Sequence, residues 1–289
     1  MRRLTDRTNS VWIDRSITVG VCRRERKCPW IDGWPRRYCA AVMATAWDAH
    51  TYDQSSDPQQ SWATDVLARL DGVEPNATVI DIGCGTGRVT EALLALVPEG
   101  RVLAIDASAD MVELTRRRLG DRAEVWCQDV LDLDLVDPVD LVVSMATLHW
   151  VPDHDRLWNR LAQALRPGGA LEVQFGGEGN IAGVYEVIEA VARDLAPELV
   201  GFSPCNYAGA RETEERLHGA GFVEIRCWLE ERPTYPEDVN AFVRTSILPA
   251  HIQRLPADRR ESFAAAVVES VRLPLDFVRL NVSAVRDGS

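Results

Sequence analysis

The sequence predicts an α/β protein: a doubly wound, mostly parallel sheet of seven strands, with a helical insertion before the last strand. Short apolar runs alternate with segments of helical periodicity along most of the chain. The connections between them are short, as in parallel sheets that carry helices on both faces. A glycine-rich turn follows the first apolar run, at the edge where such sheets bind ligands.

The first five strands are predicted mainly from apolar runs that do not alternate with polar residues, as expected for strands covered on both sides. These runs are 77–82, 101–106, 123–129, 139–146 and 170–176. Helical spacing of apolar residues predicts helices at 59–70, 88–97, 108–119 and 154–165. Ser108 is a suitable N-cap for the third of these helices, and the sequence RPGG ends the fourth.

The second half of the chain contains the predicted insertion. Segments 181–197 and 211–219 have helical spacing, whereas 222–231 and 276–287 alternate between apolar and polar residues, as strands with one drier face do. Residues 236–270, between these two strands, are again helical in pattern. We interpret 236–270 as an insertion carried by a single domain over 43–289.

The N-terminal segment differs from the rest in charge. Residues 1–42 contain ten Arg or Lys and four Asp or Glu, a net charge of +6, whereas the remainder carries −18. The segment has no clear helical or strand period, which is typical of a poorly ordered extension. Met43 is followed at once by sequence that resembles a folded enzyme, so we hypothesise that it is the true start.

Overall composition narrows the classes of partner. A net charge of −12 argues against a surface that coats nucleic acid, because phosphate binding depends on clustered Lys and Arg. No apolar run is long enough to span a membrane. The seven cysteines are scattered and odd in number, which favours a reducing cytoplasm over a disulfide framework. We therefore expect a cytoplasmic protein without nucleic-acid or membrane partners; its oligomeric state stays open.

The glycine-rich turn lies within VIDIGCGTGRV, where Gly83, Gly85 and Gly87 are separated by single residues. A dinucleotide-binding turn has the pattern G-x-G-x-x-G, but here Arg88 occupies the third glycine position. Asp81 precedes the first glycine by two residues. Its carboxylate would repel a pyrophosphate but can receive an ammonium group, so the turn predicts a ligand with a positive group and no phosphates.

Two further acids follow the next two strands. Asp106 ends the second strand, a position from which a carboxylate hydrogen-bonds ribose hydroxyls. Asp129 follows the third strand and can accept a hydrogen bond from an exocyclic amine. Together with Asp81, these acids predict a nucleoside joined to an amino acid, a description that S-adenosylmethionine fits.

Four segments carry a resemblance to the class I methyltransferases that use S-adenosylmethionine: VIDIGCGTG, LAIDAS, CQDV and ALRPGGAL. The resemblance covers about residues 44–229 and implies the Rossmann-like methyltransferase fold. It also implies that the three glycines line the methionine part of the cofactor, that Asp81 reaches its ammonium through water, and that Asp106 holds the ribose. The remaining cofactor-binding residues that it implies are Met111, Asp129 and Val130 around the adenine and Ser144 under the sulfonium.

A second resemblance concerns the acceptor. The segment SMATLHWVPDHDRLW (144–158) and Gln174 are similar to the trans-aconitate methyltransferase group, whose members esterify small carboxylic acids. The chain departs from that group at 175–180 and over its last sixty or so residues. The resemblance thus implies an acid as acceptor and leaves its identity open.

The candidate catalytic residues are His149 and Trp150, which follow the fourth strand, where the methyl acceptor should lie. The alternative is that both are structural. Trp47 and Tyr52 precede the first helix and are candidates for closing over the donor, with packing as the alternative. Arg244 and Arg254, on the predicted insertion, are candidates for the cation that holds a carboxylate; solvated positions on a helix are the alternative.

These observations predict an S-adenosylmethionine-dependent methyltransferase for a small molecule, foremost one that methylates a carboxylate oxygen. A carboxylate is already ionised at neutral pH and needs no general base, whereas a phenol or amine would make His149 more necessary. Methylation of nitrogen, carbon or a phenolic oxygen is the alternative. An RNA or protein methyltransferase that uses the basic segment as an arm, and a protein that binds the donor without turnover, are less favoured.

Overall fold

The computed structural model of this chain describes residues 57–289, with side chains from Trp62 onward. The predicted basic extension 1–42, the alternative start at Met43, and the candidates Trp47 and Tyr52 lie outside the described residues.

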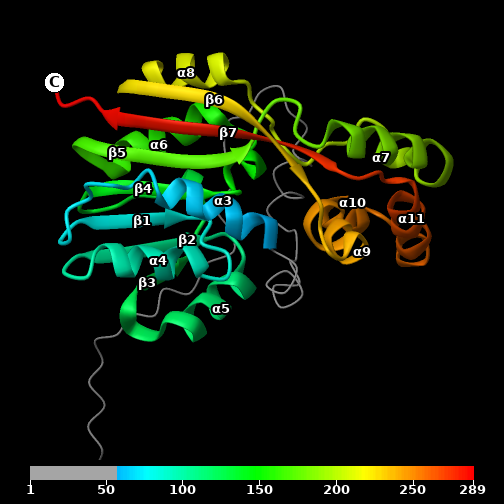
Figure 1. Ribbon diagram of the computed structural model, residues 1–289, viewed down its shortest axis with the longest axis horizontal. Helices are drawn as coiled ribbons and strands as arrows, with labels where there is room; N and C mark the ends of the chain where they lie inside the picture. The colour runs from blue at the N-terminus through cyan, green and yellow to red at the C-terminus, as the bar shows by residue number, and fades with distance from the viewer. Residues whose placement is uncertain (1–56) are drawn as a thin grey trace, which may run out of the picture. The chain divides into compact units, whose positions relative to one another are not determined.

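A single seven-stranded sheet forms the centre of the described residues, in the order β3-β2-β1-β4-β5-β7-β6 (Figure 1). Its strands are β1 (Thr78–Ile82), β2 (Arg101–Asp106), β3 (Glu124–Cys127), β4 (Val139–Met145), β5 (Leu165–Gly176), β6 (Phe222–Thr234) and β7 (Leu275–Arg286). The first five strands are parallel, and β7 is antiparallel to both β5 and β6. The predicted mostly parallel α/β sheet is confirmed, with β7 as its one reversed strand.

Helices connect successive strands. The α-helices of the sheet region are α3 (Asp57–Leu67), α4 (Arg88–Leu96), α5 (Ala109–Leu119), α6 (His154–Ala164), α7 (Ala182–Leu195) and α8 (Ala210–Gly219). Short 3-10 turns are η1 (Gly120–Arg122), η2 (Val130–Asp132), η3 (Leu148–Trp150) and η4 (Pro197–Leu199). Ser108 caps α5 as expected, because its hydroxyl accepts a hydrogen bond from the N–H of Met111 at 3.4 Å.

Both faces of the sheet are buried, which explains why the central strands are apolar throughout. In β1, Val79 packs into one core cluster and Ile80 into the other, since neighbouring strand residues point to opposite faces. The first cluster includes residues of α3, α4 and α7, and the second includes residues of α6 and α8. The sheet therefore holds the loops at its carboxyl edge in fixed positions.

β5 begins earlier than the sequence predicts. It starts at Leu165, directly after α6, and not at 170. Pro167 and the two glycines after it cannot continue the helix, so the backbone becomes extended at once. The pairing with β4 shifts register between Val139 and Leu141, which accommodates the additional residues.

Helices occupy most of the predicted insertion at 236–270. They are α9 (Val239–Phe242), the π-helical turn η5 (Val243–Ile247), α10 (Pro249–Arg254) and α11 (Ala257–Ser270). Figure 1 shows α9, α10 and α11 grouped with α7 beyond one end of the sheet. Phe242 and Phe263 belong to the same apolar cluster as Phe277 of β7, so the insertion shares its core with the sheet.

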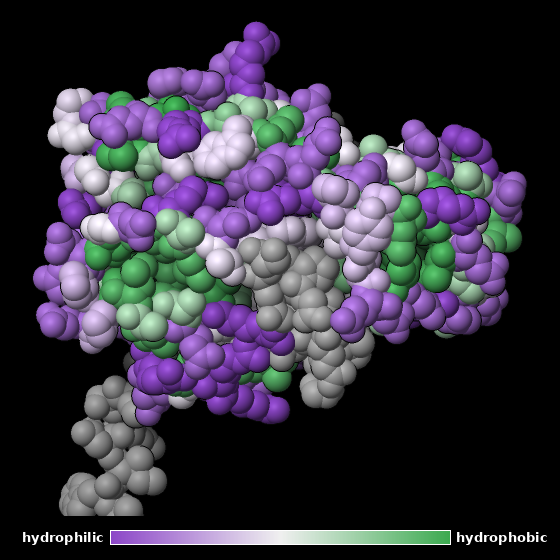
Figure 2. All heavy atoms as spheres, viewed as in Figure 1, coloured by the Kyte–Doolittle hydropathy of each residue, from purple (hydrophilic) through white to green (hydrophobic). Residues whose placement is uncertain are grey.

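Hydrophilic residues cover most of the face shown in Figure 2, and apolar residues gather mainly over α4. Among residues 57–289, no helix is both long and apolar enough to cross a membrane.

Candidate active site

The glycine-rich turn lies between β1 and α4, and all three glycines have positive φ. A Cβ at Gly83 would come within 2.2 Å of the Thr147 side chain, and one at Gly87 within 2.9 Å of Thr115. Gly85, with φ +55°, has no atom within 4 Å of such a Cβ. The turn is thus packed at its two ends and open in the middle, where a ligand can approach the backbone.

Asp106, at the end of β2, fixes this turn. Its Oδ2 accepts a hydrogen bond from the N–H of Gly85 at 2.9 Å, and its Oδ1 accepts from the N–H of Ser108 at 2.8 Å. Burial raises the pKa of Asp106 above its usual value, and the two hydrogen bonds offset part of that rise. Each carboxylate oxygen keeps further acceptor capacity, which two neighbouring hydroxyl groups of a ribose can use.

Asp81 lies under the turn, with only 1% of its surface exposed. Its Oδ2 accepts a hydrogen bond from the Thr90 hydroxyl at 2.6 Å. Burial raises the pKa of Asp81 to about 7, although the hydrogen bond from Thr90 opposes the rise. A cationic ligand nearby would favour the ionised carboxylate, so the site is suited to an ammonium group.

Asp129 lies at the same edge, because β2 and β3 are neighbouring parallel strands. Its Oδ1 accepts a hydrogen bond from the N–H of Leu131 at 2.8 Å and thereby caps η2. Burial raises the pKa of Asp129. Met111 and Val130 are buried and apolar, as a surface that packs against a purine requires. The structure thus brings the three acids to the ends of three adjacent strands.

Ser144 has no exposed surface, and its hydroxyl donates to the backbone oxygen of Ile82 at 2.8 Å. This hydrogen bond links β4 to β1, and the place of Ser144 under the sulfonium stays a prediction. Cys84 is also buried, and burial raises the pKa of its thiol, so it fills space within the turn.

The residues around the glycine-rich turn fit S-adenosylmethionine. Asp106 offers acceptors for ribose, Asp81 offers a negative charge for the ammonium, and Gly85 leaves open space for the methionine part.

A pocket of about 530 Å³, including its open mouth, lies beyond the end of β4. Its described lining residues are Trp62, Ala146, His149, Trp150, Asn180, Ile181, Tyr185, Cys205, Tyr207, Ser246, Ile247, Phe277 and Arg279. Thr147 connects it to the glycine-rich turn, since its hydroxyl donates to the backbone oxygens of Met145 at 2.9 Å and Gly83 at 3.3 Å. The pocket therefore adjoins the glycine-rich turn.

His149 lines this pocket as a neutral imidazole. Its Nδ1 accepts a hydrogen bond from the N–H of Gly176 at 3.3 Å, which places the ring proton on Nε2. Burial, followed by the positive charge of Arg279, lowers the pKa of His149 well below its usual value. With Nδ1 occupied, the ring offers a hydrogen-bond donor and no free basic nitrogen. The indole of Trp150 lies beside it, with ring centres 5.4 Å apart.

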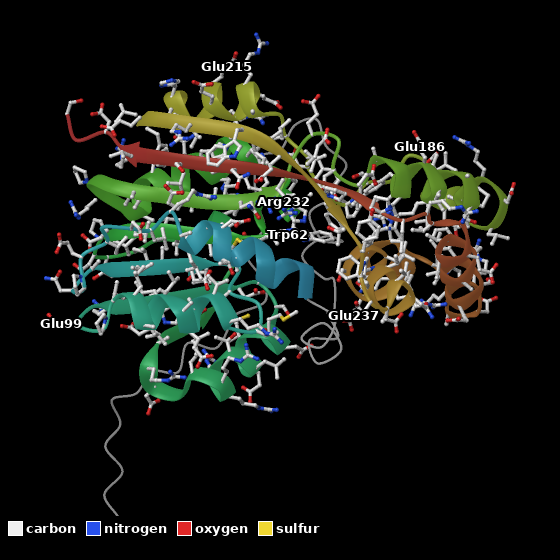
Figure 3. All side chains as sticks on the ribbon, in the orientation of Figure 1. Trp62, Glu99, Glu186, Glu215, Arg232 and Glu237 are labelled. Atoms are coloured by element: carbon white, nitrogen blue, oxygen red, sulfur yellow. The ribbon has the colours of Figure 1, made fainter. Side chains whose placement is uncertain are left out.

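Arg279 of β7 supplies a positive charge to the pocket, and sequence reasoning missed it. Only 2% of its surface is exposed, and its guanidinium carbon lies 4.4 Å from the ring centre of Trp62. Trp62 belongs to α3, where Figure 3 labels it. The alternation of the strand could have indicated the burial of Arg279, because residues two apart in a strand point to the same face and this arginine follows the apolar Phe277 by two.

The two arginines that were candidates for this cation interact elsewhere, in line with the alternative that they lie outside the pocket. Arg244 makes two hydrogen bonds of 2.9 Å to the carboxylate of Glu261. The guanidinium of Arg254 lies 4.3 Å from the ring centre of Phe202. Neither is among the residues that line the pocket. The insertion therefore contributes apolar and hydroxyl groups to the pocket, and the cation comes from the sheet.

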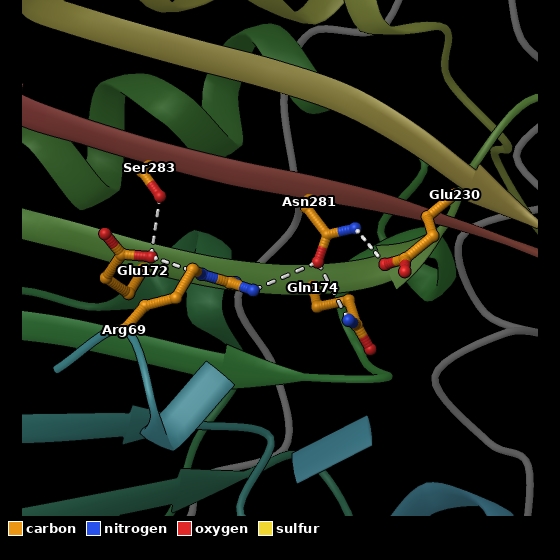
Figure 4. A network of polar contacts seen from close by, with 6 residues as sticks. All are labelled: Arg69, Glu172, Gln174, Glu230, Asn281 and Ser283. Atoms are coloured by element: carbon orange, nitrogen blue, oxygen red, sulfur yellow. Dashed lines mark hydrogen bonds and ion pairs between the residues drawn. The ribbon is translucent and has the colours of Figure 1, made fainter. Parts of the chain in front are cut away.

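A polar network holds β7 beside the pocket (Figure 4). Arg69, after α3, donates to Glu172 of β5 at 3.0 Å and to Asn281 of β7 at 3.2 Å. Gln174 donates to the same oxygen of Asn281 at 2.8 Å. Gln174, which carried part of the resemblance, is thus buried within this network and does not line the pocket. Because Asn281 is two residues from Arg279, the network also fixes the strand that carries the pocket cation.

Comparison with known proteins identifies the family of the chain. Residues 79–169 match a family model described as a methyltransferase domain. The trans-aconitate 2-methyltransferase of Azoarcus sp. (strain BH72) is 38% identical over 231 residues, which cover 76% of this chain and 87% of that protein. A malonyl-[acyl-carrier protein] O-methyltransferase of Acetivibrio thermocellus is 32% identical over 150 residues, or 51% of this chain and 53% of that protein.

Similarity to solved structures supports the fold. Phosphoethanolamine N-methyltransferase 2 of Haemonchus contortus, solved with phosphomonomethylethanolamine and S-adenosylhomocysteine, superimposes with a TM-score of 0.56 at 16% identity. The match covers 83% of this chain and 57% of that one.

Proposed function

Because the chain belongs to the class I S-adenosylmethionine-dependent methyltransferases, we propose that it methylates a carboxylate oxygen of a small organic acid. The observation that carries this proposal is the buried guanidinium of Arg279 in the pocket beside the donor site. A carboxylate in a dry pocket needs such a partner, and a planar guanidinium can hold it with two parallel hydrogen bonds. An amine acceptor that is protonated would be repelled by the same charge.

His149 supports the same acceptor chemistry. When bound, S-adenosylmethionine would supply a methyl group on a positively charged sulfur. A carboxylate oxygen that attacks the methyl carbon displaces the neutral sulfide, and no proton has to be transferred. The Nε2–H of His149 can donate to the acceptor while Gly176 holds Nδ1. A general base would instead need a free nitrogen lone pair within reach of the acceptor proton. His149 is thus proposed to orient the acid, with Trp150 as the adjacent wall of the pocket.

The donor would be held by the residues at the carboxyl ends of β1, β2 and β3. Gly83, Gly85 and Gly87 form the cradle, Asp81 faces the ammonium, and Asp106 accepts from the ribose. Asp129 and Val130, with Met111, would surround the adenine. The enzyme gains rate mainly by alignment of donor and acceptor, which can contribute about 7–11 kcal/mol.

The pH dependence of turnover tests the role of His149. Because burial keeps the pKa of His149 below its usual value, the imidazole is neutral above about pH 6, and a carboxylate acceptor is ionised there. We expect turnover to be nearly flat from about pH 6 to 9. We expect His149→Ala to lower kcat less than about tenfold, as for the loss of one hydrogen bond.

The control for this experiment is His218→Ala, because His218 is exposed on α8 and should not affect turnover. If His149 is a general base, its replacement would cost on the order of a hundredfold or more. Because the pKa of His149 is lowered by burial, an acid limb caused by such a base would lie below the ordinary range of a histidine, so the loss in the variant decides this role. A large loss would make a phenol or amine the better acceptor assignment.

Donor affinity should depend on the ionisation of Asp81. The pKa of about 7 in the free protein means that Asp81 is largely protonated at pH 6, whereas the ammonium of the donor favours the carboxylate. We therefore expect proton release on binding, with affinity rising by up to about tenfold per pH unit below pH 7 and levelling off above it. Calorimetry in buffers of different ionisation enthalpy measures the proton release. Asp81→Asn should abolish it, and a flat affinity between pH 5.5 and 7 in the parent would contradict the assignment.

A further inference from the structure

The helical insertion reaches the pocket through a single π-helical turn. Ser246 and Ile247 of η5 line the pocket together with residues of the sheet region. The turn is closed by a hydrogen bond of 2.9 Å from the N–H of Leu248 to the oxygen of Val243, five residues earlier. Such turns are rare and occur frequently at functional sites, because the additional residue changes where the following side chains point.

The Ser246 hydroxyl has no hydrogen-bond partner among the described residues, although its oxygen is buried. The hydroxyl of the preceding residue, Thr245, behaves in the ordinary way for a helix and donates to the oxygen of Ala241 at 2.8 Å. A buried hydroxyl that makes no hydrogen bond destabilises a protein. A polar group of a bound molecule would remove that cost.

Several other polar groups of the pocket already have a hydrogen bond or a proposed role. Asn180 accepts a hydrogen bond from the N–H of Val278 at 3.0 Å, and the side chain of Tyr207 hydrogen-bonds Asn180. Arg279 and His149 are assigned to the carboxylate that is methylated. Ser246 approaches from the insertion, whereas that carboxylate must face the turn after β4. The hydroxyl is therefore available to another part of the acceptor.

We propose that Ser246 is a specificity-determining residue whose hydroxyl hydrogen-bonds an oxygen of the acceptor outside the carboxylate that is methylated. This inference rests on the proposed function. It assigns the acceptor to acids that carry a hydroxyl, carbonyl or second carboxyl group in addition to the reacting carboxylate. An acid without such a group would leave the Ser246 hydroxyl buried without a partner, and it would be a poorer substrate for that reason.

The test uses pairs of acids that differ only in the additional oxygen group, such as butanoate with 3-hydroxybutanoate and with succinate, in a wider panel of aliphatic, unsaturated and aromatic acids. The parent should have a higher kcat/KM for the oxygen-bearing member of the best pair. Ser246→Ala should lower kcat/KM for that member about threefold to tenfold, the effect of one hydrogen bond, and leave the other member unchanged.

Two readouts separate this role from a structural one. Ser262→Ala, a matched change on α11 where the hydroxyl is exposed to solvent, should leave the preference intact. Ser246→Ala should melt at the same or a higher temperature than the parent, because it removes an unsatisfied buried group. An equal loss for both members of the pair, no loss for either, or a best substrate without a second oxygen group would overturn the inference. A parent that methylates no acid at all would instead overturn the proposed function.

Discussion

Arg279→Met is expected to lower kcat/KM for the acid acceptor by on the order of a hundredfold or more and to leave donor affinity unchanged. Truncation of one member of a buried, hydrogen-bonded charge pair costs about 2–5 kcal/mol, and about 1.4 kcal/mol corresponds to a factor of ten. Methionine keeps an unbranched apolar stem of similar reach, so the packing against Trp62 should be disturbed less than by alanine.

The matched control is Arg244→Met, because Arg244 is paired with Glu261 and does not line the pocket. It should keep the kcat/KM of the parent. Steady-state kinetics on the best acid, calorimetry with S-adenosylmethionine and a melting temperature together distinguish acceptor binding from donor binding and folding. Equal losses in both arginine variants, or a lost donor affinity in Arg279→Met, would contradict the assignment of the pocket cation.

Gly85→Val is expected to abolish binding of S-adenosylmethionine, because the side chain would enter the open centre of the glycine-rich turn and strain a residue with φ +55°. Asp106→Ala should weaken binding more than tenfold. It removes the acceptor for the ribose hydroxyls and also the two hydrogen bonds that hold Gly85 and Ser108 in place.

Gly120→Val is the control for backbone strain. Gly120 has φ +57° and open space around its Cβ position, but it lies in η1, after the end of α5 and away from the turn. The variant should lose stability and keep donor affinity. Calorimetry that shows parent-like binding by both Gly85→Val and Asp106→Ala would exclude this turn as the donor site.

The sheet could be predicted well from the sequence, because strands buried on both faces appear as short apolar runs that do not alternate with polar residues. The candidate donor site was equally accessible, since Asp81, Asp106 and Asp129 lie at or just after the carboxyl ends of three strands, and parallel strands bring these ends together. The start of β5 was missed because its first residues have the composition of a turn and pair irregularly with β4.

The acceptor side was less predictable for physical reasons. Arg279 reads as a polar residue of an alternating strand, and its burial follows only from the position of β7 between β5 and β6 and from the packing of Trp62. Arg244 and Arg254 were candidates for the pocket because of their place on the insertion, but their side chains contact Glu261 and Phe202 instead. Which face of a helix meets a pocket depends on tertiary packing.

The most direct test of the account is the chemical nature of the methylated product. The protein is incubated with S-adenosylmethionine labelled in its methyl group and with the panel of small organic acids, and the labelled product is treated with mild alkali. A methyl ester releases the label as volatile methanol, which is the result that we expect. Label that stays on the acceptor after alkali, as it would on a nitrogen, a carbon or a phenolic oxygen, would contradict the proposed carboxylate methylation.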